Sequence, residues 1–156
     1  MQSQEARAWQ NPFERIPAMD LTKTIQDKLK GLLPELLGIE LVEVTQDRVR
    51  ATLVVRPELC TGGKILHGGS IMAFADTLGA IGTIVNMPQG ASTATIESKT
   101  NFIGGAAEGS VVTGEATPVH KGRTTQVWQT RVAGADGKLV ALVTQTQIVK
   151  PPKGPA

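Results

Sequence analysis

The sequence predicts an α+β fold in which a long antiparallel β-sheet wraps around one central apolar helix. The first observation is a segment over residues 67–86 that is almost free of charge. The second is that two short strand-like runs precede this segment and four long ones follow it. A helix that is apolar on every side is normally buried, and a sheet wrapped around it would bury it.

The chain of 156 residues fits a single domain, because about 150 residues can bury roughly 70% of their unfolded surface around one core. Hydrophobic residues make up 40% and charged residues 19%, which excludes a disordered chain. We expect an N-terminal arm over residues 1–19, one domain over 20–149 and a disordered tail over 150–156. No internal repeat is visible.

Composition also excludes several classes of function. The net charge is +2 and aromatic residues make up 3%, so a nucleic-acid partner is not expected. No apolar run reaches the roughly 18–20 residues that span a bilayer, and the polar N-terminus lacks a secretory signal, so we expect a cytoplasmic protein without membrane contact. Cys60 is the single cysteine, which excludes an internal disulfide. Two histidines and no ligand cluster predict no metal and no cofactor.

The first predicted element is a helix over residues 21–37, with Asp20 as its N-cap. Gly31 and Pro34 weaken it, so two short helices are the alternative. Its apolar stripe recurs every three to four residues at Leu21, Ile25, Leu29, Leu32 and Leu33. Two strands, over 39–45 and 48–55, then flank a turn at Gln46-Asp47.

The central helix follows a glycine-rich loop, Thr61-Gly62-Gly63. Gly79 and Gly82 lower its intrinsic stability by about 1 kcal/mol each, so their smallness is expected to let neighbouring elements approach closely. After it we expect a meander of four long strands, over 91–103, 109–119, 122–134 and 138–149. Asp136-Gly137 predicts a tight hairpin between the last two.

Asp76 is the anomaly of the central helix. Between Ile71 and Val85 the only other polar residues are Thr77 and Thr83, and no Lys or Arg lies between residues 64 and 99. An isolated buried carboxylate costs several kcal/mol. One interpretation is a structural Asp that is hydrogen-bonded to backbone or hydroxyl groups, such as Thr77 or Thr83. The other is a general base that is poised by its apolar setting.

The N-terminal end of this helix reads His67-Gly68-Gly69-Ser70, and the glycines are expected to leave its first amides uncovered. Such an end can polarise a carbonyl oxygen. Gly69 and Asp76 lie about 10 Å apart along one helix, too far to act on the same atom. A site that uses both therefore requires two chains, as in a dimer with a two-fold axis.

Four segments together carry a family resemblance: HGGSIMAFADTLGA, a strand ending in TNF, HKGRTTQVWQTRV and ADGKLVALVTQTQIV. From about residue 35 to 149 the chain resembles the hotdog-fold acyl-CoA thioesterases, in their PaaI-like branch. The resemblance implies hydrolysis of an acyl-CoA or aryl-CoA ester. It implies that Asp76 is the catalytic carboxylate, that the Gly69 amide polarises the thioester oxygen and that His67 orients the carbonyl or assists the thiolate. It also implies a site built from two subunits and an assembly of four.

The resemblance extends to residues around this site. Thr95 matches a small hydroxyl residue that helps to hold water, with Thr93 and Ser92 as alternatives. Many relatives carry Asn or Gln six residues before the histidine that corresponds to His67, and this chain has Thr61 at that position. We expect the neighbouring Cys60 to be a buried, inert thiol. On the expected strand, an alternating pattern would place one row on a single face: Thr93, Thr95, Glu97, Lys99 and Asn101.

Two groups of residues are candidates for binding the substrate. Members of the family often bind the phosphates of coenzyme A near the strand-to-strand turn that holds His120, Lys121 and Arg123 here, although exposed turn charges are an equal alternative. Lys64 is a weaker candidate of the same kind. Gly68, Leu66, Met72 and Phe74 are candidates for an acyl pocket, where the alternative is a plain core role.

Two other functions stay open at this stage. A non-catalytic module that binds acyl-CoA would keep the fold without turnover, and Thr61 in place of an amide favours it. A hotdog hydratase or dehydratase needs a His and a carboxylate that converge on one carbon. His67 and Asp76 do not meet that need within one chain.

Overall fold

The computed structural model describes residues 18–152, with side chains from residue 21 onward. The expected arm lies outside the described residues except for 18 and 19, and most of the expected tail lies outside them as well. The helices are α1 (Ala18–Lys28), α2 (Leu33–Leu37), the short 3-10 helix η1 (Pro57–Leu59) and α3 (Gly68–Ile84). The strands are β1 (Ile39–Val44), β2 (Val49–Val54), β3 (Ser92–Phe102), β4 (Val111–Lys121), β5 (Thr125–Gly134) and β6 (Leu139–Lys150).

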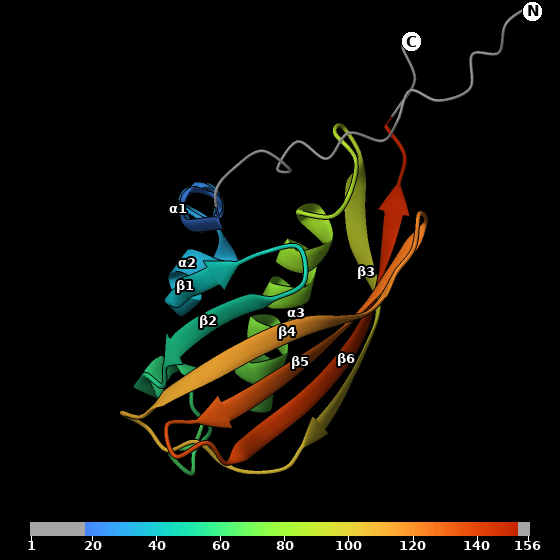
Figure 1. The fold of residues 1–156 in the computed structure, drawn as a ribbon. Coiled ribbons are helices and arrows are strands. Elements are labelled where there is room, and N and C mark those ends of the chain that lie inside the picture. The colour runs from blue at the N-terminus through green and yellow to red at the C-terminus, as the bar shows by residue number, and fades with distance from the viewer. Residues whose placement is uncertain (1–17, 153–156) are drawn as a thin grey trace, which may run out of the picture.

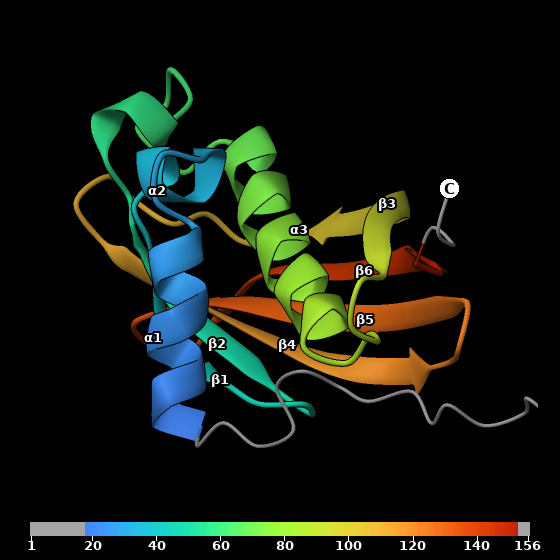
Figure 2. The same ribbon diagram turned by 90° about the horizontal axis from the view of Figure 1, so that it is seen from above.

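The six strands of the described region form one antiparallel sheet in the order β1-β2-β4-β5-β6-β3. The sheet curls around α3, and α1 packs along β1 (Figures 1 and 2). The predicted architecture of a long sheet around an apolar helix is therefore confirmed. The predicted hairpin at Asp136-Gly137 is also present, and Gly137 has a φ of 78°.

The expected meander of four strands is wrong in one respect, the place of β3. This strand pairs with β6 and not with β4, whereas β4 pairs with β2 and β5. Only β4, β5 and β6 follow one another as a meander. Within the described residues, β3 therefore forms an edge of the sheet whose second side is open.

The region before the sheet forms two helices, the alternative that Gly31 and Pro34 suggested. Gly31 adopts a φ of 74°, a left-handed conformation that ends the first helical segment. Because of this break, Leu32 and Leu33 leave the predicted apolar stripe and are more than half exposed, while its first three members are buried. The prediction of Asp20 as N-cap is wrong, since α1 begins at Ala18.

Glycines let α3 and the sheet approach one another closely, as expected. A Cβ atom on Gly82 would lie 2.8 Å from the buried indole of Trp128, and one on Gly79 would lie 2.5 Å from the side chain of Gln145. On the sheet side, Gly114 makes room for Leu78 of the helix in the same way. At each of these glycines, the backbone of one element therefore packs directly against a side chain of the other.

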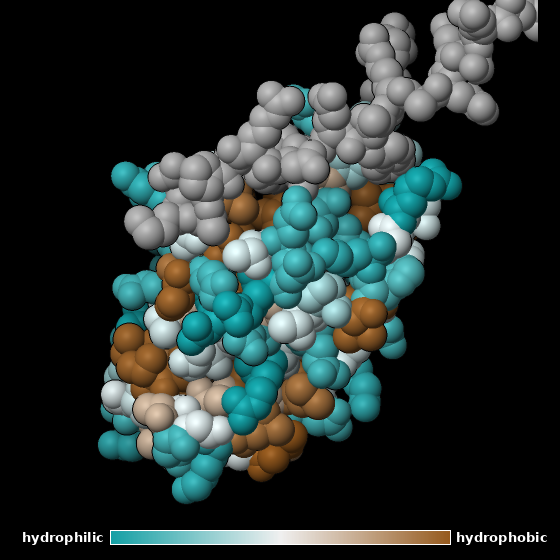
Figure 3. Space-filling model, in the orientation of Figure 1, coloured by the Kyte–Doolittle hydropathy of each residue, from teal (hydrophilic) through white to brown (hydrophobic). Residues whose placement is uncertain are grey.

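The outer face of the sheet is mostly hydrophilic, with separate apolar patches (Figure 3). Ion pairs cross this face between Arg48 and Glu43, at 2.8 Å, and between Arg50 and Glu115, at 3.6 Å. Exposed pairs of this kind contribute little to stability. No helix among residues 18–152 is long and apolar enough to cross a membrane.

Candidate active site

His67 caps the N-terminal end of α3. Its Nδ1 atom accepts a hydrogen bond of 2.8 Å from the amide of Gly69. The Gly69 amide was expected to be uncovered, and it is instead bonded to this ring. A Cβ atom on Gly69 would lie 3.0 Å from Nδ1, so glycine leaves room for the cap. Because Nδ1 is the acceptor, the proton of the neutral imidazole belongs on Nε2, which makes Nε2 a hydrogen-bond donor.

Asp76 lies in the middle of α3, half-buried, and one of its two carboxylate oxygens is held in place. Oδ1 accepts hydrogen bonds from Thr95 Oγ1 at 2.7 Å and from Gln145 Nε2 at 3.2 Å. Within residues 21–152, Oδ2 takes part in no hydrogen bond and no ion pair. The carboxylate is therefore anchored through one of its oxygens, by two neutral donors.

The expected hydroxyl partners of Asp76 are wrong. Thr77 Oγ1 donates to the carbonyl of Ala73 at 2.8 Å, and Thr83 Oγ1 donates to that of Gly79 at 3.0 Å. A hydroxyl within a helix commonly reaches the carbonyl four residues earlier, and both residues do so. The hydroxyl that does reach Asp76 belongs to Thr95, 19 residues later on β3.

A β-bulge in β3 decides which side chains face α3. Thr95 pairs with Gln147 and Glu97 pairs with Thr146, which leaves Ile96 as an extra residue. The bulge reverses the alternation, so the prediction that Glu97, Lys99 and Asn101 share a face with Thr95 is wrong. Glu97 accepts a hydrogen bond from Thr146 on the outer face, while the side that faces α3 carries Thr93, Thr95, Ser98, Thr100 and Phe102.

Two buried glutamines of β6 complete the polar group around Asp76, and the sequence reasoning missed both. Gln145 is bonded to Asp76, and Gln147 Nε2 donates to Thr95 Oγ1 at 2.7 Å. Both side chains are fully buried. Alternate residues of a strand share one face, and on β6 these are residues 143, 145, 147 and 149. Two glutamines between two valines on this face are the signal in the sequence that could have identified Gln145 and Gln147.

The other residues predicted near the helix end lie apart from this polar group. Thr61 Oγ1 accepts a hydrogen bond of 3.2 Å from the amide of Gly63 and so organises its own loop. Leu66 is buried in the core, and Met72 is exposed. Gly68 lies against Phe102, whose ring would be 3.1 Å from a Cβ atom at that position.

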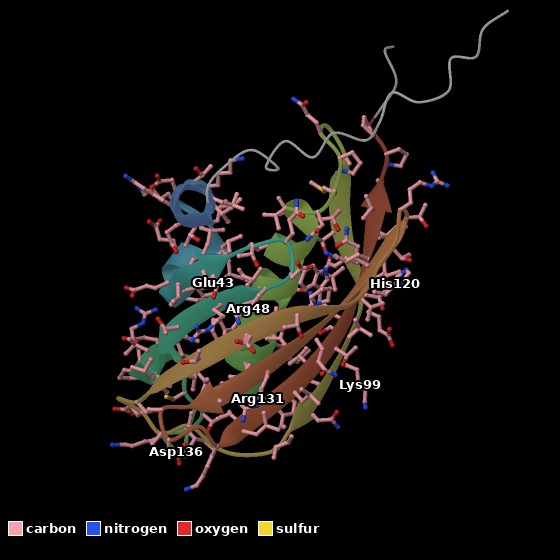
Figure 4. All side chains as sticks on the ribbon, in the orientation of Figure 1. Glu43, Arg48, Lys99, His120, Arg131 and Asp136 are labelled. Carbon is pink, nitrogen blue, oxygen red and sulfur yellow. The ribbon has the colours of Figure 1, made fainter. Side chains whose placement is uncertain are left out.

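The basic turn between β4 and β5 lies at the C-terminal end of α3. Lys121 Nζ contacts Asp47 Oδ1 at 2.6 Å and the carbonyl of Gln46 at 3.4 Å. Asn86, just beyond α3, donates to the same carbonyl at 2.8 Å. His120 and Asp136 mark opposite ends of the sheet (Figure 4). Within one chain, the turn is therefore about 25 Å from His67, the length of the helix.

Cys60 is held as a thiol. Its Sγ donates to the carbonyl of Arg56 at 3.2 Å. Burial raises the pKa of this thiol, and the negative charges of Glu108 and Glu58 raise that pKa further. A raised pKa disfavours the thiolate, which is the nucleophilic form, and this supports the expectation of an inert cysteine. The expectation of a buried side chain is wrong, since Cys60 is half-buried.

No group of three or more His, Cys, Asp or Glu side chains in the described region lies close enough together to hold a metal ion.

Comparison with protein families and curated proteins gives a consistent assignment. The model of the "Thioesterase superfamily" matches residues 63–141. The chain is 34% identical over 121 residues to a Vibrio cholerae protein that is named as a putative esterase, covering 78% of this chain and 80% of that protein. It is 28% identical over 118 residues to a 1,4-dihydroxy-2-naphthoyl-CoA hydrolase of Listeria monocytogenes, covering 76% of this chain and 95% of that protein.

Solved structures agree with the fold. A mutant thioesterase of Pseudomonas aeruginosa superposes with a TM-score of 0.81 and 26% identity, covering 88% of this chain and 97% of that chain. The PaaI protein of the Escherichia coli phenylacetic acid degradation operon superposes with a TM-score of 0.74 and 20% identity, covering 85% and 93%. At 20% identity, the match to the PaaI protein shows similarity of fold only.

Proposed function

Because this chain belongs to the thioesterase superfamily, as a PaaI-like hotdog protein, we propose that it hydrolyses acyl-CoA or aryl-CoA thioesters to the free acid and coenzyme A. The observation that carries the proposal is the state of Asp76, with Oδ1 anchored by Thr95 and Gln145 and Oδ2 unbonded within the described residues. The similarity to a relative named for hydrolysis of an aromatic CoA ester supports this substrate class.

Oδ2 of Asp76 is the atom that would act on the thioester, by one of two routes. As a general base it takes a proton from water, and the resulting hydroxide adds to the thioester carbonyl. As a nucleophile it adds to that carbonyl itself, and loss of the thiolate leaves a mixed anhydride that water then hydrolyses. Both routes break the carbon–sulfur bond, release the coenzyme A thiol and form the acid.

The start of α3 would hold the carbonyl oxygen as negative charge develops on it. With the His67 ring in its observed place, the donor it offers is Nε2–H, because Nδ1 is engaged by Gly69. The Gly69 amide reaches a substrate only when that ring turns away from it. In either case His67 and Gly69 act together, and the proposal assigns both to the carbonyl.

A complete site requires two chains. α3 runs without a break from Gly68 to Ile84, so Gly69 and Asp76 remain about 10 Å apart along it. The open edge of β3, its exposed Ile96 and Phe102, and the exposed Ile103 directly after it support this edge as the surface where two copies meet. We further propose a dimer of dimers, and a cytoplasmic location, with which the free thiol of Cys60 is compatible.

The basic turn would bind the phosphates of coenzyme A, chiefly through Arg123. This side chain is exposed and forms no ion pair with a described residue, whereas Lys121 is paired with Asp47. We expect Arg123→Ala to raise KM for a CoA ester by about tenfold, the value of one charge-assisted hydrogen bond. KM for the corresponding N-acetylcysteamine thioester, which lacks the phosphates, should stay unchanged. An equal rise for both esters would remove Arg123 from phosphate binding.

The test of the proposed function is the release of free thiol from a panel of CoA esters with aliphatic and aromatic acyl groups. We expect turnover of at least one ester by the full chain, with the free acid as the second product. A protein that binds these esters tightly and turns over none of them would instead be a binding module of this fold.

A further inference from the structure

We propose that Gln145 is a positioning residue that holds the Asp76 carboxylate so that Oδ2 faces the substrate. The inference rests on the proposed function, because it concerns how the same carboxylate is aimed. Gln145 lies on β6, far from Asp76 in the sequence. It belongs neither to the segment His67-Gly68-Gly69 nor to the hydroxyl-bearing residues of β3 that face α3.

The contact of Gln145 with Asp76 is two-fold. Its Nε2 atom donates to Asp76 Oδ1 at 3.2 Å and to the backbone carbonyl of Asp76 at 3.3 Å. One amide group therefore links the side chain of Asp76 to its own backbone, and rotation of the carboxylate away from β6 breaks the link. The opposite orientation of the amide would place Oε1 against two acceptor oxygens. Hydrogen-bond complementarity therefore assigns Nε2 to the end that faces Asp76.

Thr95 alone would not fix the carboxylate. Its bond of 2.7 Å to Oδ1 comes from an exposed residue on the edge strand, and a carboxylate can pivot about a single bond. Gln145 approaches the same oxygen from β6, the neighbouring strand. Two donors on one oxygen from two directions define the plane of the carboxylate and leave Oδ2 as the free atom.

The fold accommodates this amide at the expense of packing. Gln145 is fully buried, and its Oε1 has no hydrogen-bond partner among the described residues. An unpaired buried acceptor is unfavourable, and an apolar side chain of equal size would avoid it. On the facing helix, Gly79 leaves space where a Cβ atom would lie 2.5 Å from Cδ of Gln145. Strand and helix both give up stability at this contact, which indicates that the amide serves the site.

The test compares two isosteric replacements of buried glutamines. Gln145→Met keeps the volume and removes both bonds to Asp76. Gln126→Met is the matched control, because Gln126 is equally buried and accepts its bond from Trp128 Nε1 at 3.2 Å. For the CoA ester that the wild type hydrolyses best, we expect Gln145→Met to lower kcat by about 10- to 100-fold with KM within about twofold. Gln126→Met should retain the wild-type kcat.

A second variant, Gln145→Glu, tests the bond itself. In its acid form the new side chain can donate to Oδ1, whereas in its ionised form it repels the carboxylate. We expect the ratio of variant to wild-type kcat to rise as the pH falls. This pH-dependent rescue would not follow from a purely structural role.

A crystal structure of Gln145→Met gives a readout that does not depend on activity. We expect Asp76 to leave its wild-type rotamer or to occupy more than one. An unchanged rotamer, or an unchanged kcat in an enzyme that Asp76→Asn inactivates, would overturn the positioning role and leave the proposed function intact. Absence of turnover in the wild type would overturn the proposed function, and the rotamer of Asp76 would then decide the role of Gln145 alone.

Discussion

Asp76→Asn is expected to lower kcat for thioester hydrolysis by about 100- to 10,000-fold, the range that a general base contributes. The amide of Asn can neither take up a proton from water nor attack a carbonyl as an anion. Its oxygen can still accept the bonds from Thr95 and Gln145, so the local structure should be kept. The loss should therefore appear in kcat, with the thermal midpoint of unfolding close to that of the wild type.

Thiol release measured at saturating ester, together with a thermal melt, checks this result. Asp136→Asn is the matched control, because it makes the same chemical change to an exposed carboxylate in the β5–β6 turn, which is paired with Lys138. It should leave kcat unchanged. If Asp76→Asn turned over esters within twofold of the wild-type rate, Asp76 would be excluded as base and as nucleophile.

Mixing two inactive variants is expected to restore activity, which is the second large effect. One chain carries Asp76→Asn and keeps its His67, and the other carries His67→Ala and keeps its Asp76. If the helix start of one chain serves the carboxylate of the other, each mixed dimer contains one intact site and one doubly altered site. An equal mixture should then reach about a quarter of the wild-type activity, since about half of the dimers are mixed.

The measurement requires exchange of subunits, by co-expression or by refolding the mixed chains together. Each variant alone gives the baseline, and co-purification of an untagged variant with a tagged one shows that exchange has occurred. Activity that stays at the baseline despite exchange would place the whole site within one chain. That result would contradict the composite site while leaving the role of Asp76 intact.

The central features of this fold could be predicted because they are local in the sequence. The apolar run over α3 identifies a buried helix, and Asp76 stands out within it because it is the single charged side chain from Ile71 to Val85. Strand boundaries follow from turn residues such as Asp136-Gly137. In each case the signal lies within a few residues of the feature that it predicts.

The errors concern features that depend on tertiary contacts. The Ile96 bulge reverses an alternation that looks regular in the sequence. The pairing of β3 with β6 depends on strands that are about 50 residues apart. Gln145 was missed for the same reason, because its importance appears only once β6 lies beside α3.

His67 shows a different limit. The motif places a histidine before two glycines, but only geometry shows that its Nδ1 accepts the bond from Gly69. This contact assigns the tautomer and changes which atom is offered to a substrate. Residue identity alone therefore predicts a participant and leaves its chemical form open.

The bulge at Ile96 also separates the length of β3 from the chemistry of its inner face. If Ile96 were deleted, Thr95 would still lie opposite Gln147 and Glu97 opposite Thr146, so Ser98 and Thr100 would keep the side that faces α3. A strand that kept Ile96 but lost the bulge would instead turn Glu97, Lys99 and Asn101 toward α3. In a homologue, a gap at this position is accordingly expected to leave the lining unchanged, whereas a regular strand of the same length would replace a neutral lining by a charged one.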